Sequence, residues 1–366
     1  MIINNIKMYN FRCFSEYFLC FSQGVNIIFG SNAAGKTSIL EALSYAGVTK
    51  SFKTNNESEM IKDGNKEMAV IVKVERKSKT KEIYKIQKTI NGKCVIKNDF
   101  KYSKISDFIG NILIVSFCNY DLINLLGSPK ERRKIFEPIF CQISNEYLET
   151  CNYYQRVLKE RNALLKRLII EKSDKLLNLL KTLNEQLVDN GIKIIKARKK
   201  FINRLNEKNK KYHNLFSEEK EEVEIIYQPS VTEEMFRTEL NDNIENDIKK
   251  GTTTIGPHRD DYLFFVNKKN IVIYGSQGQQ RSCLISLKLT FVDELKEVKG
   301  ESPILLLDDI FSELDKDRQN NLLKLIDSDI QTFISTATLA DVDKGVLNKA
   351  NIITLIKEEL VWTRKI

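Results

Sequence analysis

The sequence predicts an α/β fold in which a mostly helical segment interrupts a mixed sheet. Short apolar runs typical of strands occur near both ends of the 366-residue chain. Between residues 147 and 211, by contrast, there is no proline and a single glycine, and leucine recurs every three or four positions. That spacing is typical of amphipathic helices. The order of these segments predicts two nested domains, with a helical arm inserted into an α/β head.

The first part of the head is predicted to contain strands and one inserted helix. An apolar run at 25–29 predicts a strand that ends at Gly30. A helix is predicted at 36–45, because the apolar residues there recur at helical spacing. Asn91-Gly92 predicts a β-hairpin with a type I′ turn, whose two central residues both need positive φ. Further apolar runs predict strands at 69–74, 83–89 and 112–117.

The helical arm is predicted to begin at Pro129, which suits the first turn of a helix because its missing N–H has no helical partner there. We place the arm at 129–250 and the two parts of the head at 1–128 and 251–366. Two groups of leucines predict two antiparallel amphipathic helices, namely Leu158, Leu165 and Leu168, then Leu176, Leu180, Leu183 and Leu187. Strands are predicted later at 223–227, 262–266, 271–274, 304–307 and 332–335, with a long helix at 277–298.

Composition limits the classes of protein to which the chain can belong. Lys and Arg number 58 against 49 Asp and Glu, a net charge of +9 that suits an anionic partner such as nucleic acid or a membrane surface. No run approaches the ~18 apolar residues of a membrane-spanning helix, and the N-terminus lacks the pattern of a signal peptide. We therefore expect a cytoplasmic protein without a membrane partner. Seven scattered cysteines and only two histidines predict free thiols and no zinc site.

Residues 30–37 fit the phosphate-loop pattern G-x-x-x-x-G-K-[ST] and lie between a predicted strand and a predicted helix. Such a loop turns backbone N–H groups toward phosphate, and the helix N-terminus adds positive potential. We predict that ATP binds here, with Lys36 as a catalytic residue that bridges the β- and γ-phosphates and Thr37 as a Mg²⁺ ligand. The predicted ATP-binding residues of the loop are Gly30, Ser31, Asn32, Ala33, Ala34, Gly35, Lys36 and Thr37.

The apolar strand at 304–307, followed by Asp308 and Asp309, is the predicted partner of the phosphate loop. A carboxylate at the end of a buried strand can reach the metal ion of a nucleotide site. We assign Asp308 as a Mg²⁺ ligand, acting through water, and Asp309 as the catalytic general base that orients the attacking water.

A second anion-binding element is predicted at Ser276-Gln277-Gly278-Gln279-Gln280, the signature segment, where the long helix begins. Ser276 also suits a plain N-cap, so a structural role is the alternative. A serine, a glycine and free N–H groups at a helix start also bind anions, and we assign Ser276, Gly278 and Gln279 to ATP. Two phosphate-binding elements in one chain predict a nucleotide held between two subunits, as in ABC-type ATPases, and hence an ATP-dependent homodimer.

Several further stretches match a single family. They are Asn10-Phe11-Arg12, Lys50-Ser51-Phe52-Lys53, Gly127-Ser128-Pro129, Glu131-Arg132-Arg133, Tyr154-Gln155-Arg156-Val157-Leu158-Lys159, Arg161-Asn162-Ala163-Leu164-Leu165, Gly256-Pro257-His258-Arg259-Asp260-Asp261 and Ser312-Glu313-Leu314-Asp315. With the phosphate loop, the signature segment and the acidic strand, they resemble the RecF family of bacterial DNA replication and repair ATPases. The family has an ABC-type head related to SMC heads, and the resemblance covers nearly the whole chain.

The resemblance implies a function and partners. It implies ATP and Mg²⁺ as cofactors, weak DNA-dependent ATP hydrolysis, and an ATP-driven dimer clamp on double-stranded, gapped or junction DNA. It also implies RecR and RecO as partners in loading recombinase, and roles in replication, recombination and the SOS response to DNA damage. For single residues it implies that Arg12 and Arg259 are charge partners for phosphate, and that Ser312–Asp315 resembles the D-loop of ABC-type heads.

The sequence departs from the family pattern at several positions. Ala33 replaces a usual glycine, which stiffens the loop. Asn119-Tyr120-Asp121 keeps the aspartate of a Pro-Glu-Asp-Leu element but lacks its glutamate. No histidine corresponds to the switch histidine of many ABC ATPases, where 335–338 reads Ser-Thr-Ala-Thr. Asp309 stands where many ABC proteins have glutamate, and its shorter side chain predicts slow hydrolysis, below ~10 s⁻¹.

Some readings stay open from the sequence alone. His258 is either a turn residue with a satisfied hydrogen bond or a contact at the nucleotide or the subunit interface. Arg281 is either a phosphate contact or an ion-pair partner. The ATPase subunit of a membrane transporter is the alternative function, disfavoured by the signature segment and the lysine-rich insert. A longer SMC-like or nuclease-fused relative is a third reading, but the insert is too short for a long coiled coil.

Overall fold

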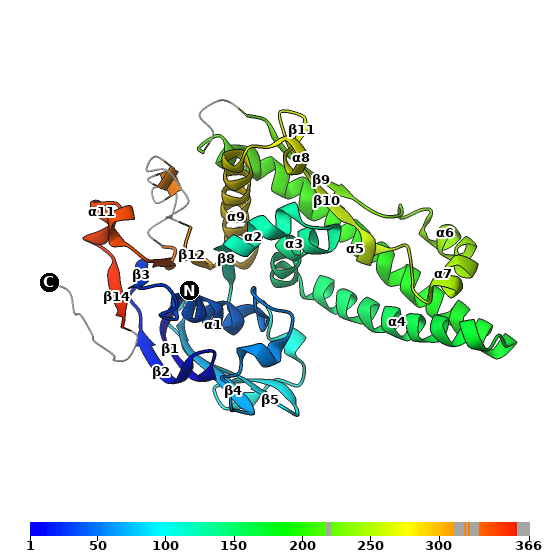
Figure 1. Cartoon of the computed structure of the whole chain (residues 1–366), viewed down its shortest axis with the longest axis horizontal. Coiled ribbons are helices and arrows are strands. Elements are labelled where there is room, and N and C mark those ends of the chain that lie inside the picture. Colours follow the sequence, from blue (N-terminus) through cyan, green and yellow to red (C-terminus); the bar gives the residue numbers. More distant parts are fainter. Residues whose placement is uncertain (217–220, 311–317, 320, 323–328, 357–366) are drawn as a thin grey trace. The chain divides into compact units, whose positions relative to one another are not determined.

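The computed structural model describes residues 1–216, 221–310, 318–319, 321–322 and 329–356 (Figure 1). Contacts divide the chain into two compact units. The first unit comprises Met1–Leu122, Tyr212–Glu218 and Arg281–Ile366, and the second comprises Ile123–Lys211 and Glu219–Gln280. The two units are therefore nested in the sequence, because the second is inserted into the first.

The second unit extends past residue 250, where the predicted arm ends. The reason is strand pairing, since β10 (Asp261–Val266) pairs antiparallel with β9 (Val223–Gln228) along its whole length. A third short strand, β11 (Lys269–Asn270), completes this sheet in the order β11-β10-β9. The signature segment consequently belongs to the second unit, whereas the division into functional domains stays a prediction.

A five-stranded parallel sheet forms the centre of the first unit. Its order is β14-β3-β13-β12-β8, so that β13 lies between β3 and β12. Helix α1 (Lys36–Val48) follows β3 and contacts β3, β8, β12 and β13. The strands are β3 (Val25–Gly30), β8 (Ile114–Cys118), β12 (Ile304–Asp308), β13 (Thr332–Thr336) and β14 (Asn351–Leu355). β12 and β13 are buried throughout, as expected of apolar strands in a parallel sheet.

The antiparallel strands of the first unit form a separate six-stranded sheet, in the order β2-β1-β4-β5-β6-β7. Along β1 and β4 buried side chains alternate with partly exposed ones, so one face of the sheet packs into the core. The predicted α/β class is confirmed, with its parallel and antiparallel strands in two sheets. The strands are β1 (Ile2–Phe11), β2 (Phe14–Cys20), β4 (Glu67–Glu75), β5 (Lys81–Thr89), β6 (Gly92–Lys97) and β7 (Phe100–Lys101).

The predicted hairpin is confirmed, but the prediction of a type I′ turn is wrong. Thr89 pairs with Gly92, so the two turn residues are Ile90 and Asn91. Neither has a positive φ, whereas Gly92 has φ 134°. The Thr89 hydroxyl accepts a hydrogen bond from the Asn91 N–H at 3.2 Å. This local bond favours a turn whose central residues do not have positive φ. The glycine therefore serves as the first residue of β6 and not as a turn centre.

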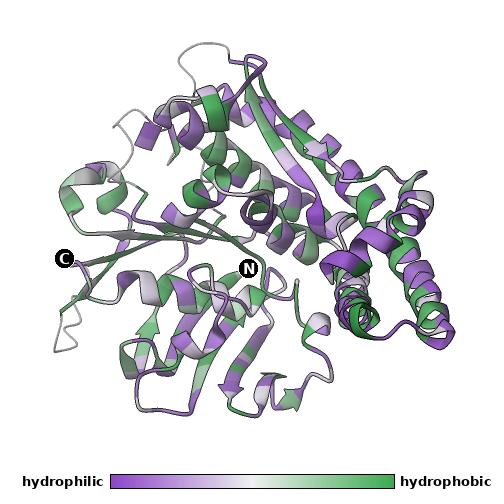
Figure 2. Ribbon diagram, turned by 45° about the vertical axis from the view of Figure 1, so that its right-hand side comes forward, coloured by the Kyte–Doolittle hydropathy of each residue, from purple (hydrophilic) through white to green (hydrophobic). Residues whose placement is uncertain are grey.

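Helices form most of the second unit, and the predicted antiparallel pair is confirmed. Hydrogen bonds join Tyr147 of α4 to Arg198 of α5 and Arg161 of α4 to Asn184 of α5, so the two helices run in opposite directions. Figure 2 shows hydrophobic and hydrophilic residues interleaved along these helices. The helices are α3 (Pro129–Ile143), α4 (Asn145–Ile170), α5 (Asp174–His213), α6 (Phe236–Asp242), α7 (Ile244–Lys250) and α8 (Ile271–Tyr274).

The strand predicted at 271–274 is wrong, because these residues form α8. The Asn270 side chain accepts a hydrogen bond from the Val272 N–H at 2.9 Å and caps this single turn. Three helices contain residues of both units, namely α2 (Asn119–Leu126), α5 and α9 (Gln277–Lys299). A short helix, α11 (Lys344–Leu347), and 3₁₀ turns at Glu57–Met60, Ile105–Asp107, Pro257–Arg259 and Leu339–Asp341 complete the described elements.

Candidate active site

The phosphate loop lies between β3 and α1, as predicted, and its two glycines are required by close contacts. A Cβ on Gly30 would lie 2.7 Å from the carbonyl oxygen of Leu355 in β14. Gly35 has φ 97°, and a Cβ there would lie 2.6 Å from the ring of Phe14. Ala33 has φ 65°, a conformation that costs a residue with a Cβ about 1–2 kcal/mol. The stiffening expected from Ala33 is therefore a local backbone strain.

The ammonium group of Lys36 lies inside the loop. Lys36 Nζ donates hydrogen bonds to the carbonyl oxygens of Gly30 at 2.7 Å and Ser31 at 3.0 Å. Burial lowers the pKa of Lys36, and the charges of Asp309 and Asp308 oppose that shift. A buried cation beside two carboxylates and a glycine-rich loop is a suitable partner for phosphate oxygens.

Asp308 ends β12 with its carboxylate buried, at 7% exposure. Its Oδ1 accepts a hydrogen bond from Ser335 Oγ at 2.7 Å. Burial raises the pKa of Asp308, and hydrogen bonds from Ser335 and from Thr37 act in the opposite direction. The structure thus brings together the two residues predicted to hold Mg²⁺, and their hydroxyl and carboxylate oxygens are the donors that this ion prefers.

Asp309 follows the strand in a left-handed conformation, with φ 57°. Its backbone N–H donates to Ser335 Oγ at 2.9 Å, so one serine hydroxyl links both aspartates. A non-glycine residue in this conformation stores about 1–3 kcal/mol of strain and is typical of functional sites. A pocket of about 400 Å³ opens here, lined by Cys13, Asn32, Ala33, Gly35, Lys36, Thr37, Ser38, Lys53, Asp309 and Ser335.

Four residues of this pocket were not predicted from the sequence, and Lys53 is the one among them that carries a charge. The Ser51 hydroxyl accepts hydrogen bonds from the N–H groups of Lys53 at 2.9 Å and Thr54 at 3.1 Å, and it donates to Glu41. These bonds hold the segment so that Lys53 faces the phosphate loop. The stretch Lys50–Lys53 matches the family pattern, but no role in ATP binding was predicted for it. The other three are Ser38, which directly follows the phosphate loop, and Cys13 and Ser335, which come from other parts of the chain.

Arg12 forms an ion pair within the first unit. Its Nε and one terminal nitrogen donate to the two oxygens of Glu41 at 2.8 and 2.6 Å, and its other terminal nitrogen donates to the carbonyl oxygen of Glu59 at 2.7 Å. Glu41 is fully buried, and its hydrogen bonds raise the pKa of Arg12. This geometry gives Arg12 a structural role between the β1–β2 turn and α1, and its predicted phosphate contact stays a prediction.

The signature segment forms a capping box at the start of α9. Ser276 Oγ accepts a hydrogen bond from the Gln279 N–H at 3.2 Å, and Gln279 Oε1 accepts one from the Ser276 N–H at 3.0 Å. The N-cap role considered for Ser276 is therefore present. Ser276 and Gln277 are exposed, and Gly278 lies in the first turn. The assignment of Ser276, Gly278 and Gln279 to ATP stays a prediction.

Comparison with known proteins gives a consistent match. The model of the AAA domain family matches residues 5–228. A protein of Streptococcus thermophilus named DNA replication and repair protein RecF is 40% identical over 346 residues, 93% of each chain. A protein of the same name from Clostridium tetani is 35% identical over 372 residues, 99% of this chain and 100% of that protein. The chain belongs to the RecF family.

Solved structures support the same assignment. The structure described as the recombination mediator protein RecF-ATP in the RecFOR pathway has a TM-score of 0.86 and 31% identity, and the match covers 93% of each chain. An SMC head domain from Pyrococcus furiosus has a TM-score of 0.52 at 17% identity, which supports the fold alone. The transporter alternative finds no support among these matches. In the described ranges, no helix is long and apolar enough to cross a bilayer.

With the RecF family established, its Gly256–Asp261 stretch has a structural explanation. Asp260 is buried and accepts hydrogen bonds from Arg198 Nη1 at 2.8 Å, from the Ser230 N–H at 2.9 Å and from the Tyr227 hydroxyl. Asp261 accepts two hydrogen bonds from the guanidinium of Arg132, at 2.7 and 2.6 Å. Two adjacent carboxylates thus tie α3, α5 and β9 together within the second unit.

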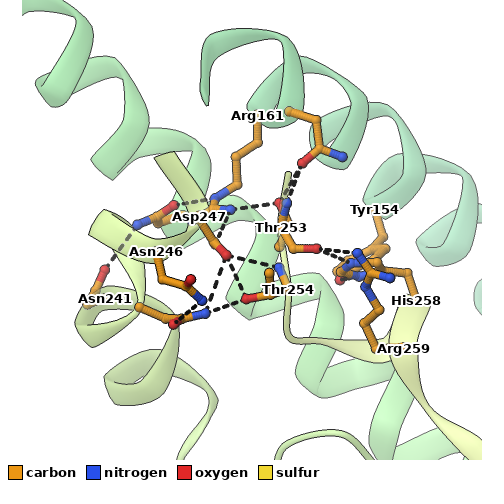
Figure 3. A network of polar contacts seen from close by, with 12 residues as sticks. Tyr154, Arg161, Asn241, Asn246, Asp247, Thr253, Thr254, His258 and Arg259 are labelled. Carbon is orange, nitrogen blue, oxygen red and sulfur yellow. Dashed lines mark hydrogen bonds and ion pairs between the residues drawn. The ribbon is translucent and has the colours of Figure 1, made fainter. Parts of the chain in front are cut away.

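His258 belongs to a neighbouring buried network in the same unit (Figure 3). His258 Nε2 donates to the carbonyl oxygen of Thr253 at 3.1 Å, so Nδ1 accepts from the Tyr154 hydroxyl at 2.8 Å. Burial lowers the pKa of His258 to about 4, which keeps the ring neutral. Beside it, Arg161 pairs with Asp247 at 2.7 Å, both fully buried. The structure favours the reading of His258 as a satisfied structural residue.

The altered family element at 119–121 retains a structural contact. Asp121 Oδ2 accepts a hydrogen bond from the Cys118 N–H at 3.0 Å, at the start of α2. Asp121 Oδ1 accepts one from Lys288 of α9 at 2.7 Å, and both side chains are buried. Asp121 therefore fixes α9 to the end of β8, whose last residue pairs with Asp308. The predicted D-loop, Ser312–Asp315, lies outside the described residues.

Proposed function

We propose that this RecF-family chain is an ATP-driven dimer clamp on DNA in replication and recombinational repair. The observation that carries the proposal is that Lys36, Thr37 and Asp309 line one pocket at the phosphate loop, with Asp308 hydrogen-bonded to Thr37. ATP and Mg²⁺ are its proposed cofactors, and hydrolysis is weak and stimulated by DNA. Relatives described as acting in the RecFOR pathway support RecR and RecO as partners and loading of recombinase as the outcome.

In the proposed nucleotide complex Lys36 exchanges the carbonyl oxygens of Gly30 and Ser31 for phosphate oxygens. Thr37 and Asp308 would hold Mg²⁺, which would supply positive charge beside the phosphates. Burial raises the pKa of Asp308, and the hydrogen bonds from Ser335 and Thr37 favour its ionised form. Lys53 adds a second cation on the wall of the same pocket.

Asp309 is the proposed general base, which orients the attacking water. Its backbone has a left-handed conformation, and its N–H is hydrogen-bonded to Ser335. The side chain of aspartate is shorter than that of glutamate, so its carboxylate lies farther from the attacking water and orients that water less well. We therefore infer turnover below ~10 s⁻¹, close to or below the median of enzymes.

The signature segment is proposed to meet the γ-phosphate of ATP bound to a second copy of the chain. Ser276 supplies a hydroxyl, and the start of α9 supplies backbone N–H groups and the positive end of the helix dipole. ATP then contacts both subunits and stabilises the closed dimer only while its γ-phosphate is present. Hydrolysis removes those contacts and releases the clamp.

A basic groove on α5 is the proposed contact for DNA in the second unit. The groove has a volume of about 410 Å³ and is lined by Lys196, Lys199, Lys200, Asn203, Arg204, Glu207 and Glu233. Lys199 and Lys200 are exposed, and the ion pair that Lys196 makes with Glu233 is long at 3.9 Å. Exposed lysines on one helix face attract the phosphate backbone without reading bases, so binding is sequence-independent and weakened by salt.

The test compares wild type with Lys36→Ala and Ser276→Arg for dimer formation and duplex DNA binding, with and without ATP and Mg²⁺. We expect Lys36→Ala to lose ATP binding and therefore both responses. Ser276→Arg should bind ATP as wild type does and fail to dimerise. Normal ATP-dependent dimerisation of Ser276→Arg would contradict the sandwiched arrangement, and equal DNA binding with and without ATP would contradict the clamp.

A further inference from the structure

Glu221 lies beside the start of α9, within the second unit. Its Oε1 accepts a hydrogen bond from Gln279 Nε2 at 2.8 Å. The oxygen of the same Gln279 amide group, Oε1, accepts a hydrogen bond from the Ser276 N–H at 3.0 Å. One glutamine side chain therefore links a carboxylate to the first residue of the signature segment. Two hydrogen bonds and one amide group place Glu221 within about 8 Å of Ser276.

A carboxylate suits this place in the isolated chain. The first turn of a helix carries partial positive charge and N–H groups without helical partners, and an anion stabilises both. α9 has 23 residues, so its dipole is well developed, and Ser276 and Gln277 are exposed at its start. Glu221 is thus an anion that the chain itself supplies to the segment proposed to bind phosphate.

We propose that Glu221 restrains ATP-driven dimerisation, because its negative charge lies where the γ-phosphate of ATP on a second copy would approach. This inference rests on the proposed function, in which Ser276 meets that phosphate. Like charges within about 8 Å repel, and salt screens the repulsion because Ser276 is exposed and Glu221 partly so. A closed dimer contains two such sites, so a threefold effect at each site multiplies to about tenfold in the dimer dissociation constant.

The test uses two substitutions that separate charge from hydrogen bonding. Glu221→Gln removes the charge and keeps an oxygen that accepts from Gln279, whereas Glu221→Ala removes both. Glu224→Gln is the matched control, because Glu224 is exposed in the neighbouring strand β9 and loses the same charge. Sedimentation velocity of the full chain with ATPγS and Mg²⁺ gives the dimer dissociation constant, at low salt and at 1 M salt. Binding of a fluorescent ATP analogue to dilute, monomeric protein reports on the phosphate loop.

We expect both Glu221 variants to dimerise about tenfold more tightly than wild type at low salt, and the gain to shrink below about twofold at 1 M salt. Glu224→Gln should stay within about twofold of wild type, and nucleotide affinity of the monomer should be unchanged in all variants. If Glu221→Gln behaves as wild type while Glu221→Ala dimerises less well, Glu221 only positions Gln279, and the restraint is wrong. If wild type forms no dimer with ATPγS and Ser276→Arg makes no difference, the proposed function itself falls, and the restraint falls with it.

Discussion

The hydroxyl of Ser335 donates a hydrogen bond to Asp308 at 2.7 Å, across the paired strands β13 and β12. The same oxygen accepts the N–H of Asp309 at 2.9 Å. Ser335 therefore positions both aspartates of the site, although it lies 27 residues from the first of them in the sequence. Only the pairing of β13 with β12 brings Ser335 to the site.

Replacing Ser335 by alanine should weaken the Mg²⁺-dependent steps. The substitution removes a hydrogen bond that favours the ionised carboxylate, so the pKa of Asp308 rises further. We expect Mg²⁺ to bind about tenfold more weakly, as is typical when a partner of a metal ligand is lost. ATP hydrolysis measured against Mg²⁺ concentration gives the shift. Thr336→Ala is the control, because that buried hydroxyl donates to the Thr338 carbonyl instead. Equal Mg²⁺ dependence of both variants would contradict the role of Ser335.

Replacing Arg12 by alanine should destabilise the first unit. Glu41 is fully buried and would lose two charged hydrogen bonds. Leaving such a carboxylate unpaired typically costs about 3 kcal/mol in the free energy of unfolding. Urea unfolding of the nucleotide-free protein measures the loss, and Arg12→Lys should fall between wild type and alanine because it keeps the charge but not the paired geometry. Unchanged stability together with reduced ATP affinity would favour the predicted phosphate contact.

Replacing Lys53 by alanine should weaken ATP binding. The side chain lines the pocket, and its positive charge acts to lower the pKa of Asp308. Losing one cation near the phosphates should reduce affinity by about tenfold, with little change for adenosine, which lacks them. Lys50→Ala is the control, because Lys50 is exposed and does not line the pocket. Calorimetric titrations with ATP and with adenosine separate a phosphate contact from a general loss of structure.

His258 should make stability depend on pH below neutrality. Its pKa is lowered from 6.5 to about 4 in the folded protein, so the unfolded chain binds the proton more tightly. Stability is therefore fully present above about pH 6.5 and falls as the pH is lowered toward 4, by about 2 kcal/mol at pH 5. Denaturant unfolding at pH 7.5 and pH 5 measures this change. His258→Gln should be less stable at pH 7.5 and should lose less on acidification, and an equal loss in both proteins would contradict the prediction.

Charge reversal on α5 should weaken DNA binding and reduce its dependence on salt. In the double variant Lys199→Glu, Lys200→Glu two exposed cations of the groove become anions. If each contacts one phosphate, the slope of log affinity against log salt should fall by about 2. Lys175→Glu, Lys181→Glu is the control, because those lysines are exposed on the same helix and do not line the groove. Equal slopes for both double variants would place the DNA contact elsewhere.

Features encoded by local patterns could be predicted from the sequence. The phosphate loop with α1, the apolar strand that ends at Asp308, and the antiparallel helices α4 and α5 all follow from spacing within a short segment. The strand predicted at 271–274 is wrong because an apolar run of four residues has no period, and the Asn270 cap favours a helical turn. The turn of the β5–β6 hairpin differs because the Thr89 hydroxyl stabilises another turn one residue earlier.

Contacts between distant segments could not be predicted. Lys53 reaches the pocket only because Ser51 bonds to Glu41 of α1, and Ser335 reaches Asp308 only because β13 lies beside β12. The Gly256–Asp261 stretch contains a histidine and two aspartates, which are residue types typical of catalytic sites. In the structure its two carboxylates accept hydrogen bonds from Arg198 and Arg132, so the motif is explained by the fold of the second unit.

The position of β3 in its sheet has a consequence for protein synthesis. β3 pairs on one side with β13 and on the other with β14, both formed by residues after 331. At ~5–20 residues per second, the ribosome finishes these neighbours on the order of 15 to 60 seconds after β3 itself. Until then the strand that precedes the phosphate loop lacks both of its neighbours in the sheet. A nascent chain should therefore acquire its nucleotide site only after β13 and β14 have been made, so ATP binding reports that this sheet is complete.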